Sequence, residues 1–167
     1  MGDVRIEEVA PDDWSAWRDL RLRSLRDAPD AFGSTYQREV AFGEADWRSR
    51  LDVTSGPDVI AYADDRPVGL GAGWRDEPGQ LMVVAMWTEP TWRGRGVGRQ
   101  VLDHVVGWGA ARDLRVHLWV ADANPAARRL YERYGFRPDG RTMPLRDGSP
   151  FTASHLVLAT EPVGSAG

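Results

Sequence analysis

The chain has 167 residues with a formal net charge of -4, enough for one domain that folds around its own core. Its composition, 42% hydrophobic and 28% charged, is ordinary for a globular protein, and a pI near 5.4 argues against nucleic-acid binding. The absence of cysteine excludes disulfides and a cysteine nucleophile. Because no apolar run could span a bilayer and no secretory signal is visible, we expect a cytoplasmic protein without a membrane partner.

The hydrophobic pattern alternates along the chain between strand spacing and helix spacing. Periods of two and of about 3.6 residues distinguish the two classes, and Gly, Pro and Asp separate the segments. Segment 32–40 fits neither class, and the polar residues 161–167 predict a flexible C-terminal tail. The expected elements are a strand at 4–8, helices at 12–25 and 44–51, strands at 59–63, 68–74 and 81–87, a helix at 96–112, a strand at 116–120, a helix at 125–134, and strands starting at 136 and at 154–158.

This order of elements predicts a single α/β domain over residues 1–160. Helices that alternate with strands are expected to cover both faces of one sheet. The hairpin-like spacing of several strands favours a mixed, mostly antiparallel and twisted sheet. We expect the last strand, residues 154–158, to close the sheet.

The most informative segment joins the strand at 81–87 to the helix at 96–112. Its three glycines allow backbone N–H groups to point inward, and the first N–H groups of a helix have no internal partner. Such a turn binds a phosphate or pyrophosphate well, and three arginines without an acid add local positive charge. The residues expected to bind this anion are Arg93, Gly94, Arg95, Gly96, Val97, Gly98 and Arg99.

Two other classes of phosphate site fit these glycines poorly. The dinucleotide-binding fingerprint would need its third glycine where Arg99 stands, and residues 89–93 separate the strand from the first glycine. A Walker loop requires a lysine, and all 21 basic residues of this chain are arginines.

The glycine segment resembles the Arg/Gln-x-x-Gly-x-Gly/Ala signature of the GCN5-related N-acetyltransferases, the GNAT superfamily. A later run, Asn124-x-x-Ala127-x-x-Leu130-Tyr131-x-x-x-Gly135-Phe136, resembles a second signature of that family at a fitting spacing. The resemblance covers about residues 81–137. It implies the GNAT fold and the transfer of an acetyl group from acetyl-CoA to a primary amine by direct attack in a ternary complex. The amine would belong to a small molecule or to a peptide or protein N-terminus.

The resemblance also implies roles for the matched residues. The pantetheine arm of acetyl-CoA would pair with the strand edge formed by the backbone of Met86, Trp87 and Thr88, as a peptide does in strand addition. A backbone N–H there would polarise the thioester carbonyl. Tyr131 corresponds to the general acid that protonates the departing thiolate, beside the coenzyme. Asn124 would contact the coenzyme and also cap its helix.

The general base and the acceptor stay open at this stage. Glu89 is our candidate base, and Asp122 and Glu39 are alternatives, acting directly or through water. The resemblance implies that segments 27–40 and 141–154 surround the acceptor. The spacing of the three histidines indicates no metal site, and none is expected.

A second class of function also fits the fold. A non-catalytic acyl-CoA-binding or regulatory module would need the phosphate turn but no acid, so the presence of both Asn124 and Tyr131 favours the enzyme. Eight tryptophans are many for this length, and some of them could form a homodimer interface.

Overall fold

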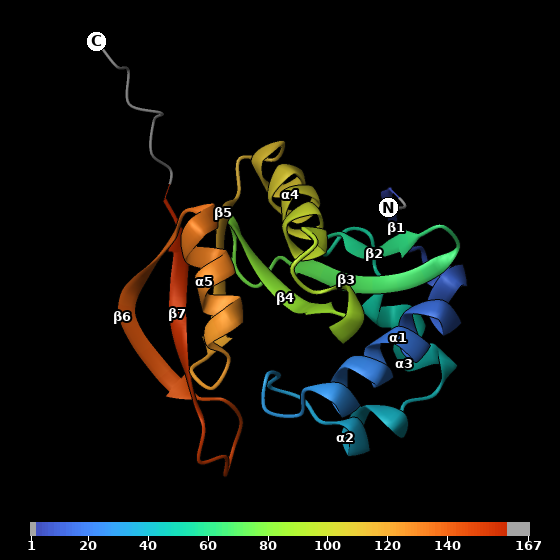
Figure 1. Cartoon of the computed structure of the whole chain (residues 1–167), viewed down its shortest axis with the longest axis horizontal. Coiled ribbons are helices and arrows are strands. Elements are labelled where there is room, and N and C mark those ends of the chain that lie inside the picture. Colours follow the sequence, from blue (N-terminus) through green and yellow to red (C-terminus); the bar gives the residue numbers. More distant parts are fainter. Residues whose placement is uncertain (1–2, 160–167) are drawn as a thin grey trace.

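The computed structural model describes residues 3–159, and the predicted tail at 161–167 lies outside this part. Within it, seven strands form one sheet in the order β1-β2-β3-β4-β5-β7-β6 (Figure 1). Every neighbouring pair is antiparallel except β4 and β5, which are parallel. The elements are β1 (Val4–Glu8), η1 (Pro11–Asp13), α1 (Trp14–Asp27), α2 (Tyr36–Val40), α3 (Glu44–Arg50), β2 (Asp58–Ala63), β3 (Arg66–Trp74), β4 (Gln80–Thr88), η2 (Pro90–Trp92), α4 (Val97–Ala110), β5 (Arg115–Ala121), α5 (Pro125–Tyr134), β6 (Phe136–Pro144) and β7 (Thr152–Leu158).

The predicted α/β fold is confirmed, with two differences. The ambiguous segment 32–40 contains the short helix α2, which starts where the Thr35 side chain accepts a hydrogen bond from the Arg38 N–H. The sequence predicts that the last strand closes the sheet at its edge, but β7 lies between β5 and β6, and β6 forms the edge. The side chains of β7 are largely buried or half-buried, whereas nearly all of those on β6 are exposed, so burial favours β7 in the interior position.

Two cores separate the helices onto opposite faces of the sheet (Figure 1). On one face, α4 packs through Val97, Val101 and Val105 against β2 to β5, and α5 extends this layer over β5 and β6. A Cβ atom at Gly71 would lie 2.5 Å from Val101 Cγ1, so a glycine there allows the close approach of helix and sheet. On the other face, α1 and α3 bury Leu20 and Trp47.

A chain of polar side chains centred on two buried histidines crosses the parallel seam between β4 and β5. His117 Nδ1 lies 2.8 Å from His155 Nε2, so the two histidines share a hydrogen bond between β5 and β7. The outer nitrogen of His117 contacts Asp76, in the β3–β4 turn, at 2.9 Å, and that of His155 contacts Asp139, on β6, at 2.6 Å. These contacts link the two halves of the sheet where they are paired only briefly.

Candidate active site

A cleft of about 400 Å³ opens between the end of β4, the start of α5 and the loop after α1. It gathers residues that the two sequence signatures place far apart in the chain. The predicted coenzyme-binding residues that line it are Met86, Trp87, Thr88, Arg93, Gly98, Asn124 and Tyr131.

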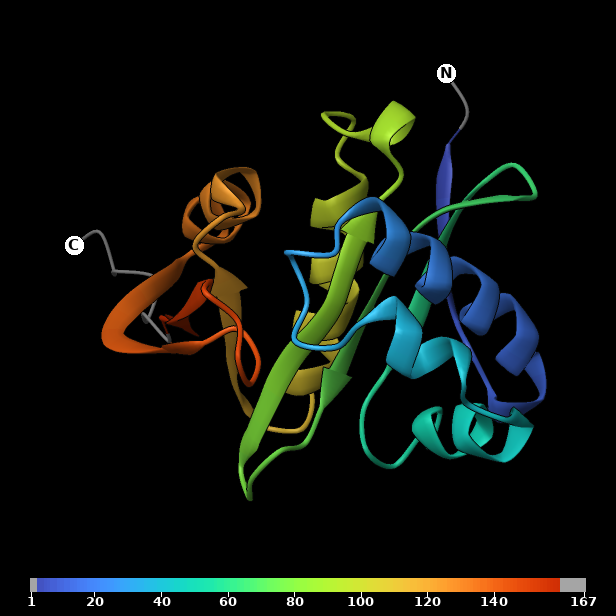
Figure 2. The same ribbon diagram turned by 90° about the horizontal axis from the view of Figure 1, so that it is seen from below.

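The cleft forms because β4 and β5 pair over a short distance and then diverge, as Figure 2 shows. Their pairing ends at Val83 and Leu118, while β4 continues to Thr88 on the β3 side. Two residues of β4, Ala85 and Met86, stand opposite a single residue of β3, which is a β-bulge with Ala85 in the left-handed region at φ 60°. The β4 edge beyond Val83 is therefore free of a neighbouring strand and able to pair with an extended amide chain.

The turn before α4 has the backbone that the glycines predicted. Gly94 and Gly96 have φ values of 77° and 84°, and Gly96 is the residue immediately before α4. A Cβ atom at either position would meet no atom within 4 Å, so these glycines are needed for conformation and not for packing. The Val97 side chain is buried in the core, which leaves its backbone as the part able to meet an anion. The turn thus presents the unpaired N–H groups of a helix start.

The three arginines of the turn differ in their surroundings. Arg93 pairs with Asp27 at 2.6 Å and donates to the Thr88 carbonyl, so it ties the end of α1 to the end of β4. Arg95 and Arg99 are exposed; Arg95 stacks over Trp92, and Arg99 lies over the ring of Tyr134. Within residues 3–159, Arg95 and Arg99 form no ion pair, so their charges are available to an anion in solution.

Tyr131 lies on the cleft side of α5 with its ring packed edge-on against Phe136. Its side chain is 7% exposed, and burial raises the pKa of its hydroxyl above the ordinary value. The hydroxyl is thus protonated at neutral pH and able to donate a proton in the cleft. Asn124 caps α5, because its side chain accepts the Ala127 N–H at 3.2 Å, and it lines the same cleft.

The structure places Glu89 outside the cleft lining. One of its carboxylate oxygens contacts Arg23 at 2.8 Å and Arg66 at 3.3 Å, and the other is buried without a partner among the described residues. Its side chain is only 12% exposed. These contacts favour a structural role in which the Glu89 carboxylate joins Arg23 of α1 to Arg66 of β3. The assignment of Glu89 as the general base stays a prediction.

The two alternative carboxylates are held in strong hydrogen bonds. Burial alone would raise the pKa of Glu39, but the bidentate contact with Arg21 outweighs it and lowers that pKa. Hydrogen bonds from the hydroxyls of Ser154 and Thr152 lower the pKa of Asp122. Both groups are therefore ionised and weakly basic at neutral pH.

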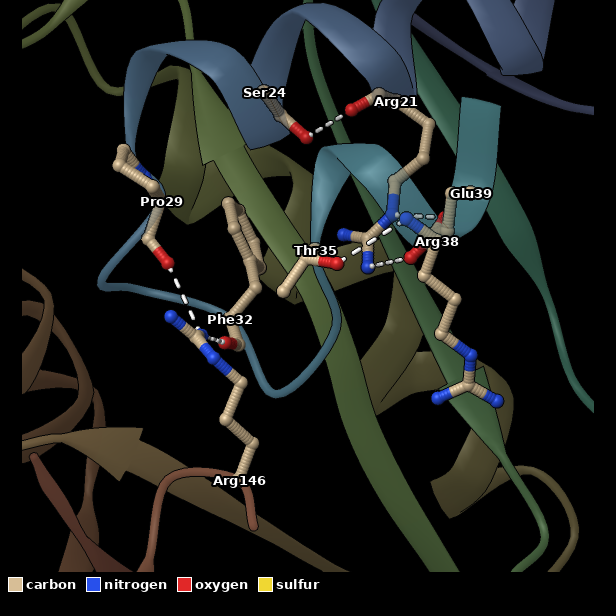
Figure 3. A network of polar contacts seen from close by, with 8 residues as sticks. All are labelled: Arg21, Ser24, Pro29, Phe32, Thr35, Arg38, Glu39 and Arg146. Atoms are coloured by element: carbon tan, nitrogen blue, oxygen red, sulfur yellow. Dashed lines mark hydrogen bonds and ion pairs between the residues drawn. The ribbon is translucent and has the colours of Figure 1, made fainter. Parts of the chain in front are cut away.

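The predicted acceptor segments meet across the molecule through one arginine. The Arg146 guanidinium, in the segment after β6, donates to the carbonyl oxygens of Phe32 at 2.8 Å and Pro29 at 3.2 Å (Figure 3). Phe32 is buried and lines the cleft beside Tyr131. The sequence analysis predicted both segments but not the hydrogen bonds of Arg146 that join them. No local pattern in either segment indicates which carbonyl group a distant arginine will contact.

Comparison with known proteins identifies the family of the chain. The family model described as "Acetyltransferase (GNAT) family" matches residues 14–136. The chain belongs to this family. The match includes both sequence signatures and every predicted site residue, and it confirms the predicted GNAT membership.

Several relatives of the chain are named as acetyltransferases. The chain is 33% identical over 158 residues to a mycothiol acetyltransferase of Nocardiopsis dassonvillei, covering 85% of this chain and 46% of the relative. It is 30% identical to an aminoglycoside N(6')-acetyltransferase type 1 of Stenotrophomonas maltophilia, covering 62% of this chain and 65% of the relative. The chain thus spans about half of the first relative's length and under two thirds of the second's.

The fold agrees with a solved structure of an acetyltransferase from Salmonella typhimurium with its cofactor acetyl-CoA. The TM-score is 0.74 at 14% identity, over 99% of both chains. Within residues 3–159, no helix is long and apolar enough to cross a membrane, and no group of three or more His, Asp or Glu side chains is placed to hold a metal ion.

Proposed function

We propose that this GNAT protein transfers an acetyl group from acetyl-CoA to a primary amine, by direct attack within a ternary complex. One observation carries the proposal: a single cleft brings together a free strand edge, a buried tyrosine and Gly98 of the helix start. The left-handed turn at Gly94 and Gly96 lies directly before that helix start, outside the cleft lining. These three parts match the amides, the pyrophosphate and the thiolate leaving group of one coenzyme. A metal has no place in this proposal.

The coenzyme is held mainly by backbone groups. Its pyrophosphate meets the N–H groups of residues 94–99, and the exposed side chains of Arg95 and Arg99 add positive charge. Its pantetheine arm pairs with Met86, Trp87 and Thr88 along the free edge of β4. Arg93 acts through its contact with Asp27, which holds the floor of the cleft in place.

The reaction needs one bond to form and one to break. The neutral amine nitrogen attacks the thioester carbonyl carbon, and a backbone N–H at the β4 bulge stabilises the oxyanion, which is worth roughly 3–4 kcal/mol for one well-placed donor. The C–S bond then breaks, and the departing CoA thiolate takes the proton of the Tyr131 hydroxyl. Tyr131 is later reprotonated from solvent. The amine proton leaves through water, with Glu89 as the predicted base.

An assay with purified protein tests this function. Acetyl-CoA and a panel of amines, including amino acids, polyamines, aminoglycosides and peptides, are screened for release of free CoA. Release that depends on both the amine and the intact Tyr131 is the expected result. Acetyl-CoA binding in calorimetry without turnover of any amine would favour the non-catalytic module, and absence of binding would contradict both. The cytoplasmic location and the homodimer stay predictions.

A further inference from the structure

A second cavity, of about 610 Å³, lies on the face of the sheet that carries α1, α2 and α3. It meets the coenzyme side at the β4 bulge. A narrow space of about 60 Å³ in the β4–β5 wedge is lined by Tyr131 and also by Val84 and Ala85, and these last two residues line the larger cavity as well. A molecule in the large cavity therefore reaches the bulge from the side opposite to the coenzyme.

Asp58 lies at the far end of this cavity, in register with the bulge. It pairs with Ala72 of β3, and Ala72 pairs with Val84 of β4, so the three side chains point to the same face of the sheet. Ala72 is small and leaves the space between the two outer residues open. Since neighbouring strands lie about 4.8 Å apart, the Asp58 backbone is roughly 10 Å from that of Val84. Asp58 is thus too far from the bulge to take a proton from an amine there.

The carboxyl group of Asp58 has no partner in the protein. Among residues 3–159 it accepts no hydrogen bond and forms no ion pair, although burial and the negative charges of Asp52 and Glu8 act on it. These three effects raise the pKa of Asp58 to about 7. The far end of the cavity is therefore a negative, incompletely solvated environment that a cation would stabilise.

The arginines that line the same cavity do not neutralise Asp58. Arg21 is held by Glu39 in a bidentate pair, which Figure 3 shows, and the guanidinium of Arg50 lies over the Phe42 ring at 4.4 Å. Arg38 is the third arginine of the lining. Among residues 3–159, none of these arginines forms an ion pair with Asp58. The path between Asp58 and the bulge is instead apolar, with Met82 and the half-exposed Trp74 beside Ala72.

We infer that the large cavity is the acceptor site and that Asp58 selects acceptors with a second cationic group, separated from the reacting amine by an apolar chain that spans about 8–10 Å. This inference rests on the proposed function, because it places the reacting amine at the Ala85 bulge. Linear diamines with a polymethylene chain have this chemistry. One ammonium group meets the Asp58 carboxylate, the methylenes cover Ala72 and Met82, and the other nitrogen, once neutral, reaches the thioester.

Hexamethylenediamine and hexylamine form the test pair, because they differ only in the second amino group. With acetyl-CoA as donor, we expect the native protein to use the diamine with at least about tenfold higher kcat/KM, as a charged hydrogen bond in a partly buried site would give. Asp58→Asn should bring the ratio of the two substrates close to one. Asp65→Asn, which removes an exposed charge from the β2–β3 turn, should leave the ratio unchanged.

Direct binding separates this inference from the proposed function. Calorimetry of hexamethylenediamine against the protein without coenzyme should show binding that is lost in Asp58→Asn and kept in Asp65→Asn, whether or not acetyl transfer occurs. A diamine preference that survives in Asp58→Asn, or equal use and binding of both amines by the native protein, would overturn the role of Asp58. Failure of acetyl-CoA itself to bind would instead contradict the proposed function.

Discussion

The two sides of the β4 bulge are built in different ways. On the proposed coenzyme side, the groups that we expect to bind belong to the backbone: the positive-φ turn at Gly94 and Gly96 and the free edge of β4. On the opposite side, the cavity is lined by side chains from helices and strands between residues 17 and 85, and its charges include paired and unpaired groups. Backbone groups bind a ligand with little dependence on side-chain identity, whereas binding in the opposite cavity depends on which side chains line it.

This contrast also explains why the features of one side are easier to recognise in the amino-acid sequence than those of the other. Backbone conformation at a turn restricts the residue types allowed there, so glycine marks it in the sequence. A cavity wall accepts many residue types provided that volume and charge are balanced elsewhere. The sequence therefore predicts a coenzyme site more readily than a substrate specificity.

The largest expected effect concerns the chemistry of the coenzyme side. Tyr131→Phe should lower kcat by about 100-fold or more, because the leaving thiolate loses its proton donor, while the Kd for acetyl-CoA changes little. Steady-state kinetics and calorimetry measure the two quantities. Tyr134→Phe is the matched control: its hydroxyl, on the same helix, bonds to Asp103 outside the cleft lining, so its removal should leave kcat unchanged. If the kcat of Tyr131→Phe equals that of the native protein at every pH, the Tyr131 hydroxyl has a structural role and is not the proton donor.

The next effect concerns coenzyme affinity. Gly96→Ala should raise the Kd for acetyl-CoA by about tenfold to a hundredfold, because a side chain strains the left-handed turn that aligns the N–H groups. Gly79→Ala is the control: Gly79 has a φ of 77°, and a Cβ atom there would meet no atom within 4 Å, but it lies in the β3–β4 turn and does not line the cleft. Both variants should lose similar stability in urea unfolding. Equal coenzyme affinity in the two variants would contradict the pyrophosphate assignment.

A smaller effect on stability tests the state of Asp58 on the opposite side. The pKa of Asp58 is about 7 in the folded protein and about 3.9 in an unfolded chain. Below pH 4 the carboxyl group is protonated in both states, and the native protein has its full stability. As pH rises to about 7, the unfolded chain loses this proton more readily than the folded protein, so the free energy of unfolding falls. Asp58→Asn avoids this loss. It should match the native free energy of unfolding at pH 4 and exceed it by about 2 kcal/mol at pH 8, a figure reduced for partial solvent access. Equal stability at both pH values would show that Asp58 is not held in a negative, buried environment.

The smallest expected effect concerns Glu89, the predicted base. Its contacts with Arg23 and Arg66 lead us to expect that Glu89→Gln lowers kcat by less than about tenfold and lowers stability in urea unfolding. Arg66→Gln breaks one of the same contacts without touching the carboxylate and should give a similar but weaker change. A loss of 100-fold or more in kcat, with the acidic limb of the pH profile removed, would establish Glu89 as the base.

Local sequence patterns predicted most of the fold. Helices α4 and α5 and strands β2 to β5 lie close to their expected positions, because their periodicity and end residues agree. The pattern failed for α2, whose five residues are too few for a helical period, and for the place of β7, since sheet order depends on which strand buries more surface.

For this protein, the sequence by itself determined the local structure of the proposed coenzyme side: the glycine turn, Asn124 as a cap and Tyr131 on its helix follow from short-range rules. Only the tertiary structure decided the bulge at Ala85, the Arg146 link and the row from Asp58 through Ala72 to Val84. These features depend on strand register and on contacts between segments distant in the chain. No local pattern encodes them, because each partner's position is set by packing of the whole sheet.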